Sequence, residues 1–215
     1  MADTIVARSG TATVGEGRQC RVLDNLSGES KRRAAMFRKS MGYWMGWVVV
    51  AGLALSGSAQ AAATLAIKSS AFDNGQSIPT RFSCSGGNTS PPLSFSGVPR
   101  KAKSLALIVD DPDAPGGLFT HWVLYNLAPD LVVLAPGAST QPLPGPAVTA
   151  DNSTHHANYH GMCPPPGDGA HHYHFKLFAL DERLPSNLKS RAAVLKAMQG
   201  HVIAHTQIVG TYQRK

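Results

Sequence analysis

The chain has 215 residues, of which 43% are hydrophobic and 15% charged, so it can bury a core and lacks the composition of a disordered protein. Its formal net charge is +7, but residues 1–61 hold 8 Lys/Arg and 4 Asp/Glu, which leaves 12 against 9, or +3, for residues 62–215. Because that body has no stripe of Lys/Arg interleaved with aromatic residues, we do not expect it to bind nucleic acid.

The N-terminal part has the features of a secretion signal. Residues 31–39 are basic, residues 41–55 are apolar, and small residues then lead to an A-x-A site that ends at Ala61. The apolar run is shorter than the roughly 20 residues that a transmembrane helix needs. We therefore predict cleavage after Ala61 and a periplasmic or secreted protein, with a retained anchor as the alternative. No cysteine follows the apolar run, so a lipid-modified N-terminus is not expected.

Residues 1–35 do not fit this signal, because they are polar and glycine-rich and lack a periodic apolar face. A signal peptide that began at Met36 would have a normal length. We therefore interpret residues 1–35 as a misassigned or disordered extension, residues 36–61 as the signal peptide and residues 62–215 as one folded domain. An unusually long basic region before the apolar run is the alternative.

Dense Pro and Gly predict short elements in the domain. Apolar runs, or runs rich in β-branched and aromatic residues, predict strands at residues 65–68, 93–96, 105–109, 121–127, 173–180 and 202–212. One helix is predicted at residues 188–199, where apolar residues share a side and Gly200 provides a stop. Strands and helices do not alternate, so we expect a mainly β fold, a sandwich or a compact two-sheet structure.

The cysteines predict one disulfide bond. Cys20 lies in the part expected to be removed, which leaves Cys84 and Cys163 as an even pair in an oxidising compartment. Two buried free thiols are the alternative.

Three carboxylates gather where the predicted strand 105–109 ends, namely Asp110, Asp111 and Asp113. They repel one another unless a cation or a hydrogen-bond donor lies near. His121 opens the next strand and lies beside them if the intervening Pro/Gly loop folds back. Neighbouring carboxylates would then raise the pKa of His121, while burial would lower it. An ordinary Asp/Pro turn is the alternative.

A second polar cluster begins the predicted strand after a proline-rich loop. Its residues are His171, His172 and Tyr173. Imidazole and phenol donate hydrogen bonds, so this strand end suits an oxyanion. A solvent-exposed strand end without a binding role is the alternative.

The sequence does not favour a metal site or a known hydrolase. Residues 155–174 hold six histidines, but His155 and His156 are adjacent, no H-x-x-x-H lies on the predicted helix, and no C-x-x-C spacing occurs. No G-x-S-x-G, H-E-x-x-H or Walker motif is present. We therefore expect no metal and no cofactor.

Several motifs occur in a specific order: NTSPPL at residues 88–93, DPDAP at residues 111–115, HWVLYN at residues 121–126, and CPP at residues 163–165 before HHY at residues 171–173. In this combination the chain resembles the phosphatidylethanolamine-binding protein family, also called Raf kinase inhibitor-like, in its bacterial branch. The tail from residue 197 to residue 212 also resembles that family.

The resemblance implies a two-sheet antiparallel β-sandwich with a C-terminal helix and a small pocket for phosphate-like anions, including phospholipid headgroups. On the family's motif the ligand-binding positions are Asp111, Asp113, His121, His171 and Tyr173. The three ring side chains are expected to donate to the anion, and the two aspartates to orient a histidine or to accept from a ligand ammonium group. A secondary part of the pocket is expected at Pro164, Pro165 and His172.

Two positions depart from the family's pattern. Met162 stands in place of a proline, which removes one constraint on the loop, and His172 stands in place of an arginine, which removes a fixed positive charge. Anion affinity is therefore expected to rise as pH falls through the histidine range.

These features lead us to expect an exported protein that binds a small anion and is not an enzyme. Regulation or inhibition of a partner protein is a further role that such a protein could have. A hydrolase that acts on a phosphate ester or an acyl group is the alternative. No nucleophile with an obvious partner base supports it.

Overall fold

The computed structural model describes residues 64–215. The predicted extension, the signal peptide and Cys20 lie outside the described residues. None of the helices within residues 64–215 is long and apolar enough to cross a membrane.

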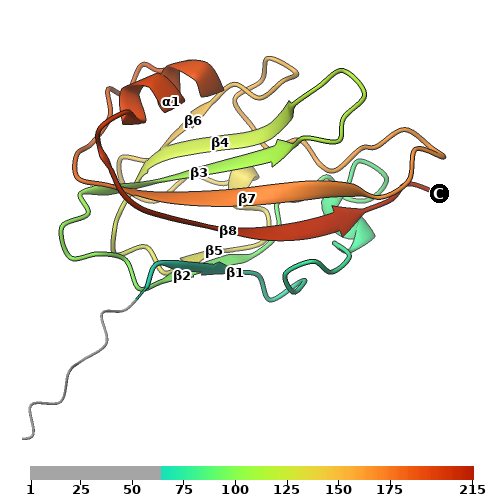
Figure 1. The fold of residues 1–215 in the computed structure, drawn as a ribbon, viewed down its shortest axis with the longest axis horizontal. Helices are drawn as coiled ribbons and strands as arrows, with labels where there is room; N and C mark the ends of the chain where they lie inside the picture. Colours follow the sequence, from blue (N-terminus) through green and yellow to red (C-terminus); the bar gives the residue numbers. More distant parts are fainter. Residues whose placement is uncertain (1–63) are drawn as a thin grey trace, which may run out of the picture. The chain divides into compact units, whose positions relative to one another are not determined.

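Two antiparallel sheets make up the domain (Figure 1). The larger sheet has the strand order β6-β4-β3-β7-β8. Its strands, in chain order, are β3 Ser104–Asp111, β4 Phe119–Leu127, β6 Val148–Ala150, β7 His171–Leu180 and β8 Val202–Tyr212. The smaller sheet has the order β1-β2-β5, with β1 Ala66–Lys68, β2 Leu93–Ser96 and β5 Val133–Leu134. Three short helices complete the fold: the 3-10 turns η1 Thr80–Phe82 and η2 Ala138–Thr140, and the α-helix α1 Arg191–Met198.

The central strand β3 is buried along its whole length because both faces of the larger sheet are covered. Leu105 and Leu107 point toward the smaller sheet, into the core that includes Phe95. Ala106 and Ile108 point to the opposite face, which packs beneath α1. Figure 1 shows α1 over one face of this sheet and the smaller sheet over the other. Covering on both sides explains why the strand is a continuous apolar run rather than an alternating one.

The predicted mainly β, two-sheet fold is confirmed, and one element boundary was wrong. The helix starts at Arg191 rather than at residue 188, because the Ser190 side chain caps it by accepting from the Ala193 N–H. Leu188 is held outside the helix, since its backbone N–H and C=O both bond the Tyr125 hydroxyl. The short strands β5 and β6 and both 3-10 turns were not predicted from the sequence.

Candidate functional site

A β-bulge in β4 places His121 at the end of the larger sheet. Val109 pairs with Trp122, but Asp110 pairs with Thr120, so His121 is the extra residue between the two pairs. A bulge of this kind redirects a side chain and is common beside binding sites. Here it turns His121 into a cavity that Asp111, the last residue of β3, also lines.

The cavity has a volume of about 290 Å³. Its walls combine four polar or ring side chains from the strand ends with two loops rich in proline. The lining residues are Asp111, Ala114, Pro115, Gly116, Phe119, His121, His160, Cys163, Pro164, Pro165 and His171. Three of the predicted ligand-binding residues therefore meet in one place, namely Asp111, His121 and His171. Pro164 and Pro165 of the predicted secondary part line the same cavity.

The three neighbouring aspartates do not share one site. Asp110 points to the opposite face of the sheet, where it is fully buried. Its carboxylate accepts from Lys176 Nζ at 3.0 Å and from Arg191 Nε and Nη2, both at 3.0 Å. Thr120 Oγ1 donates to the same carboxylate at 3.0 Å. The expected repulsion between Asp110 and Asp111 is thus relieved, because alternation along the strand separates them and fixed cations hold Asp110.

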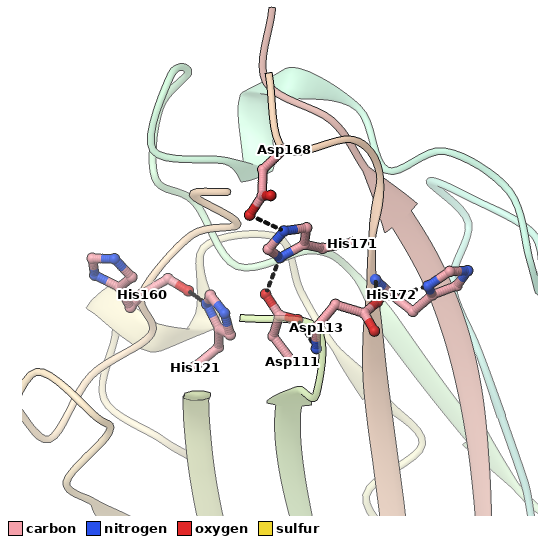
Figure 2. Close-up of polar contacts among 7 residues, drawn as sticks. All are labelled: Asp111, Asp113, His121, His160, Asp168, His171 and His172. Atoms are coloured by element: carbon pink, nitrogen blue, oxygen red, sulfur yellow. Dashed lines mark hydrogen bonds and ion pairs between the residues drawn. The ribbon is translucent and has the colours of Figure 1, made fainter. Parts of the chain in front are cut away.

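His171 lies between two carboxylates (Figure 2). Its Nδ1 is 2.8 Å from Asp111 Oδ2, and its Nε2 is 3.3 Å from Asp168 Oδ2. Burial alone would lower the pKa of His171, but the hydrogen bonds and charges of Asp111 and Asp168 outweigh it and raise the pKa. The ring therefore favours the imidazolium form, with both N–H groups donating to carboxylates.

His121 has the opposite protonation. Burial lowers its pKa to about 4, and its nearest charged neighbour, Asp111, does not reverse that shift. Two hydrogen bonds clamp the residue to His160: the His160 N–H donates to the His121 carbonyl at 2.9 Å, and His121 Nδ1 lies 2.8 Å from the His160 carbonyl. A carbonyl can only accept, so Nδ1 carries the proton and Nε2 is the unprotonated nitrogen. The sequence prediction that His121 donates to an anion is therefore not supported for this form of the ring.

Tyr173 lies beneath the cavity rather than on its wall. Its ring is fully buried and packs edge-on against His121, with ring centroids 5.2 Å apart. The His171 ring lies nearly parallel to it, with centroids 6.5 Å apart. Burial and the nearby Asp111 carboxylate raise the pKa of its hydroxyl, so it stays protonated. That hydroxyl finds no hydrogen-bond partner among the described residues.

Asp113 and His172 form a separate pair on the surface. His172 donates to Asp113 Oδ2 through its backbone N–H at 2.8 Å, and its Nδ1 is also 2.8 Å away. The hydrogen bond with the His172 side chain lowers the pKa of Asp113. Neither residue lines the cavity. Asp113 instead touches the site through its backbone, because its N–H donates to Asp111 Oδ1 at 2.9 Å.

Backbone bonds and a disulfide fix the loop that closes the cavity. Cys84 and Cys163 form the predicted disulfide bond, which joins residues 79 apart in the chain. Beside it, the Cys84 N–H donates to the Met162 carbonyl at 3.1 Å, and Met162 is fully buried. Only glycine fits at position 161, since a Cβ there would lie 2.6 Å from Asn88 Oδ1. The loop is thus held in place without the proline that Met162 replaces.

Comparisons with known proteins agree with this architecture. A family model described as phosphatidylethanolamine-binding protein matches residues 68–213. The chain belongs to the phosphatidylethanolamine-binding protein family.

Relatives of this family member occur in archaea and bacteria. A UPF0098 protein of Pyrococcus horikoshii is 41% identical over 173 residues, which cover 78% of this chain and 86% of the relative. LppC of Mycobacterium tuberculosis, named as a candidate lipoprotein, is 39% identical over 160 residues, 72% of this chain and 75% of the relative.

Two solved structures resemble the described domain. The crystal structure of a phosphatidylethanolamine-binding protein homologue from Chlamydia trachomatis is 42% identical, covers 71% of this chain and 99% of its own, and has a TM-score of 0.66. Escherichia coli YbcL, described as a member of the mammalian family, is 36% identical with the same TM-score and covers 71% of this chain and all of its own.

Several residues at the site were not predicted from the sequence, and three of them carry ring or charged side chains. His160 and Phe119 line the cavity, and Asp168 contacts His171. His160 had no signal of its own, since its place follows from the backbone clamp on His121. Asp168 could have been found, because it lies only three residues before His171. The glycines on both sides of it can adopt a positive φ, so the chain can turn there and bring Asp168 back to His171. The described residues hold no group of three His, Cys, Asp or Glu side chains arranged to bind a metal.

Proposed function

We propose that this protein is exported and binds a small oxyanion, such as a phosphate ester or a phospholipid headgroup, in the cavity beside His171. The observation that carries the proposal is that His171 Nε2 already contacts an oxyanion of the chain itself, the Asp168 carboxylate. A ligand oxyanion would take that position with the same charge and the same hydrogen bond.

The Asp168 contact can be exchanged. Asp168 is 43% exposed, and its contact with His171 is long, at 3.3 Å, against 2.8 Å for the contact with Asp111. Gly167 and Gly169 flank it, both with φ of 85°, so the turn consists of residues with wide conformational freedom. Asp111 stays in place as the buried counter-ion, and His171 therefore keeps one carboxylate when the other is replaced.

The size and the walls of the cavity favour a small organic anion. A volume of about 290 Å³ is close to the lower end of the range of about 300–1,000 Å³ for ligand sites. Pro115, Phe119, Pro164 and Pro165 supply apolar walls. An anionic group attached to a short apolar or zwitterionic group would therefore fit better than a bare inorganic ion.

Binding is favoured over hydrolysis by the groups that line the cavity. The lining includes no serine, threonine or lysine, and its one cysteine, Cys163, is part of a disulfide. His121 has a bare nitrogen, but its pKa of about 4 makes it a weak base. Asp111 is engaged by His171 and by a backbone N–H.

Export is supported by three observations. The sequence carries a signal-like segment at residues 36–61, the domain contains a disulfide bond, and one relative is named as a candidate lipoprotein. The cavity would then meet ligands outside the cytoplasm.

Calorimetric titration of the domain with phenyl phosphate tests the binding proposal. His171→Gln should weaken binding by about tenfold or more, because a charge-assisted hydrogen bond contributes about 1.5–3 kcal/mol. His205→Gln is the matched control, since His205 is exposed on β8 and distant in the sheet from the cavity lining. Absence of binding to the wild-type protein, or an unchanged affinity in His171→Gln, would contradict the proposal.

A further inference from the structure

His121 has a buried ring nitrogen, Nε2, that is a hydrogen-bond acceptor without a partner among the described residues. The residue is 2% exposed and lines the cavity. The bond from Nδ1 to the His160 carbonyl fixes the proton on Nδ1. A buried acceptor without a partner is costly, so the ligand is expected to satisfy it.

The two other polar side chains beside His121 that lie on β3 and β7, Asp111 and His171, already have partners. Asp111 is a carboxylate that accepts from His171 and from the Asp113 backbone N–H. His171 is a donor, but each of its nitrogens already contacts a carboxylate. A ligand that contacts both His121 and His171 must therefore present a donor hydrogen to His121 and an oxygen acceptor to His171.

We propose that the cavity selects oxyanions that carry their own acidic proton, such as the monoanion of a phosphomonoester, over anions of equal charge that have none. This inference rests on the proposed function. The P–O⁻ oxygen replaces Asp168 at His171 Nε2, and the P–OH group donates to His121 Nε2. No proton is transferred and no bond is broken, so the complex needs no co-reactant.

The same geometry disfavours two related ligand classes. A phosphodiester has one negative charge but no P–OH, so it would leave His121 Nε2 unsatisfied or bring an oxygen against its lone pair. A phosphomonoester dianion has the same defect and a second negative charge beside Asp111. A primary ammonium ion could donate to His121, but it would face the imidazolium of His171.

The pH window for a test lies between two pKa values. A phosphomonoester loses its second proton near pH 6, and His121 becomes protonated only near pH 4. The titratable groups that face His121 are Asp111 on β3, His160 on the loop and Tyr173 on β7, and the charge of Asp110 acts on it from the other face of the sheet. At about pH 5.5 the ring is therefore still neutral while the monoester carries its proton.

Calorimetry with matched probes decides the inference. At about pH 5.5, phenyl phosphate should bind about tenfold more tightly than methyl phenyl phosphate, a diester with the same charge, and the ratio should fall toward one at about pH 8. The diester measures every pH effect that belongs to the protein, His171 included. Benzylamine, an ammonium probe of similar size, should bind more weakly than phenyl phosphate at both pH values.

A variant separates the acceptor from the rest of the ring. His121→Asn removes the Nε2 acceptor but keeps an N–H group near the Nδ1 position for the His160 carbonyl. It should abolish the preference for the monoester over the diester, because neither ester then meets an unsatisfied lone pair. His205→Asn is the matched control and should keep the preference.

Sedimentation with phosphatidylcholine vesicles, with and without phosphatidic acid, then shows whether the monoester is a lipid headgroup or a soluble compound, and either result fits the inference.

The outcomes that overturn the inference differ from those that overturn the proposed function. If neither ester binds, the anion site itself is wrong. If both esters bind equally at about pH 5.5, or the diester binds more tightly, the anion site stands and the proton requirement is wrong. If benzylamine binds as tightly as phenyl phosphate, the donor requirement is met by a cation and the inference fails.

Discussion

Two neighbouring aspartates at the end of β3 form two different charge clusters. The outer cluster holds Asp110 with Lys176 and Arg191, whose positive charges persist at every physiological pH. The inner cluster holds Asp111 with His171, whose charge depends on protonation. The outer cluster ties α1 to the sheet, since Arg191 is the first residue of that helix. The comparison indicates that fixed charge serves the fold here, while titratable charge lies where a ligand would bind.

Removal of the disulfide should have the largest effect on stability. It should also weaken ligand binding at the inner cluster. The bridge closes a loop of 79 residues, which corresponds to about 4 kcal/mol on the chain-entropy model. The Cys84→Ala, Cys163→Ala double variant should unfold at a correspondingly lower urea concentration. Phenyl phosphate affinity should also fall, because Cys163 lines the cavity. A stability loss below about 1 kcal/mol would contradict the expectation.

Asp110→Asn should break the outer cluster at the next largest cost. The substitution leaves Lys176 and Arg191 without their buried counter-ion, and we expect a loss of about 3 kcal/mol in the free energy of unfolding. Asp113→Asn is the matched control and should cost less than about 1 kcal/mol, because the Asp113–His172 pair is exposed. Ligand affinity of the folded Asp110→Asn protein should change little. An equal loss in the free energy of unfolding of Asp110→Asn and Asp113→Asn would show that the buried cations do not make Asp110 special.

Acid should destabilise the protein through His121. The folded pKa of about 4 lies below the ordinary 6.5, so the unfolded chain binds the proton more readily between these values. The free energy of unfolding should therefore fall as pH falls from about 6.5 to about 4, by roughly 2–3 kcal/mol from this residue. Urea titrations of the wild type and of His121→Asn across this range measure the difference. Parallel curves would show that folding does not lower the pKa of His121.

Asp168→Asn should produce the smallest change in stability and the clearest change in binding. The substitution removes the carboxylate that competes for His171 Nε2, so phenyl phosphate should bind up to about tenfold more tightly. The stability cost should stay near 1 kcal/mol or less, because Asp168 is largely exposed. Weaker binding in Asp168→Asn would show that this carboxylate supports the ligand rather than competes with it.

Much of the fold followed from the sequence because its strands are long apolar or aromatic runs. The five strands predicted from residue 93 onward appear at nearly the predicted places, and the last, Val202–Tyr212, has the predicted bounds. The start of α1 was misjudged because Leu188 is apolar like the helix residues, yet a hydrogen bond from another strand holds it. Strands of two or three residues, such as Val133–Leu134, carry too little pattern to be recognised.

The site was predicted as a set of residues but not as a set of roles. The motifs gave His121, His171 and Asp111, and all three line the cavity. The protonation of His121 could not be predicted, because it depends on burial and on a carbonyl 39 residues away in the chain. The separation of Asp113 from the cavity depends on a surface pair with His172 that no local pattern indicates.

The two hydrogen bonds between His121 and His160 use only the backbone of His160. Any residue at position 160 except proline offers the same N–H and carbonyl, so the tautomer of His121 does not depend on which side chain stands there. That side chain nevertheless lines the mouth of the cavity and packs on Phe119, with ring centroids 5.6 Å apart. A substitution at position 160 would thus reshape this part of the cavity wall without changing which nitrogen of His121 carries the proton.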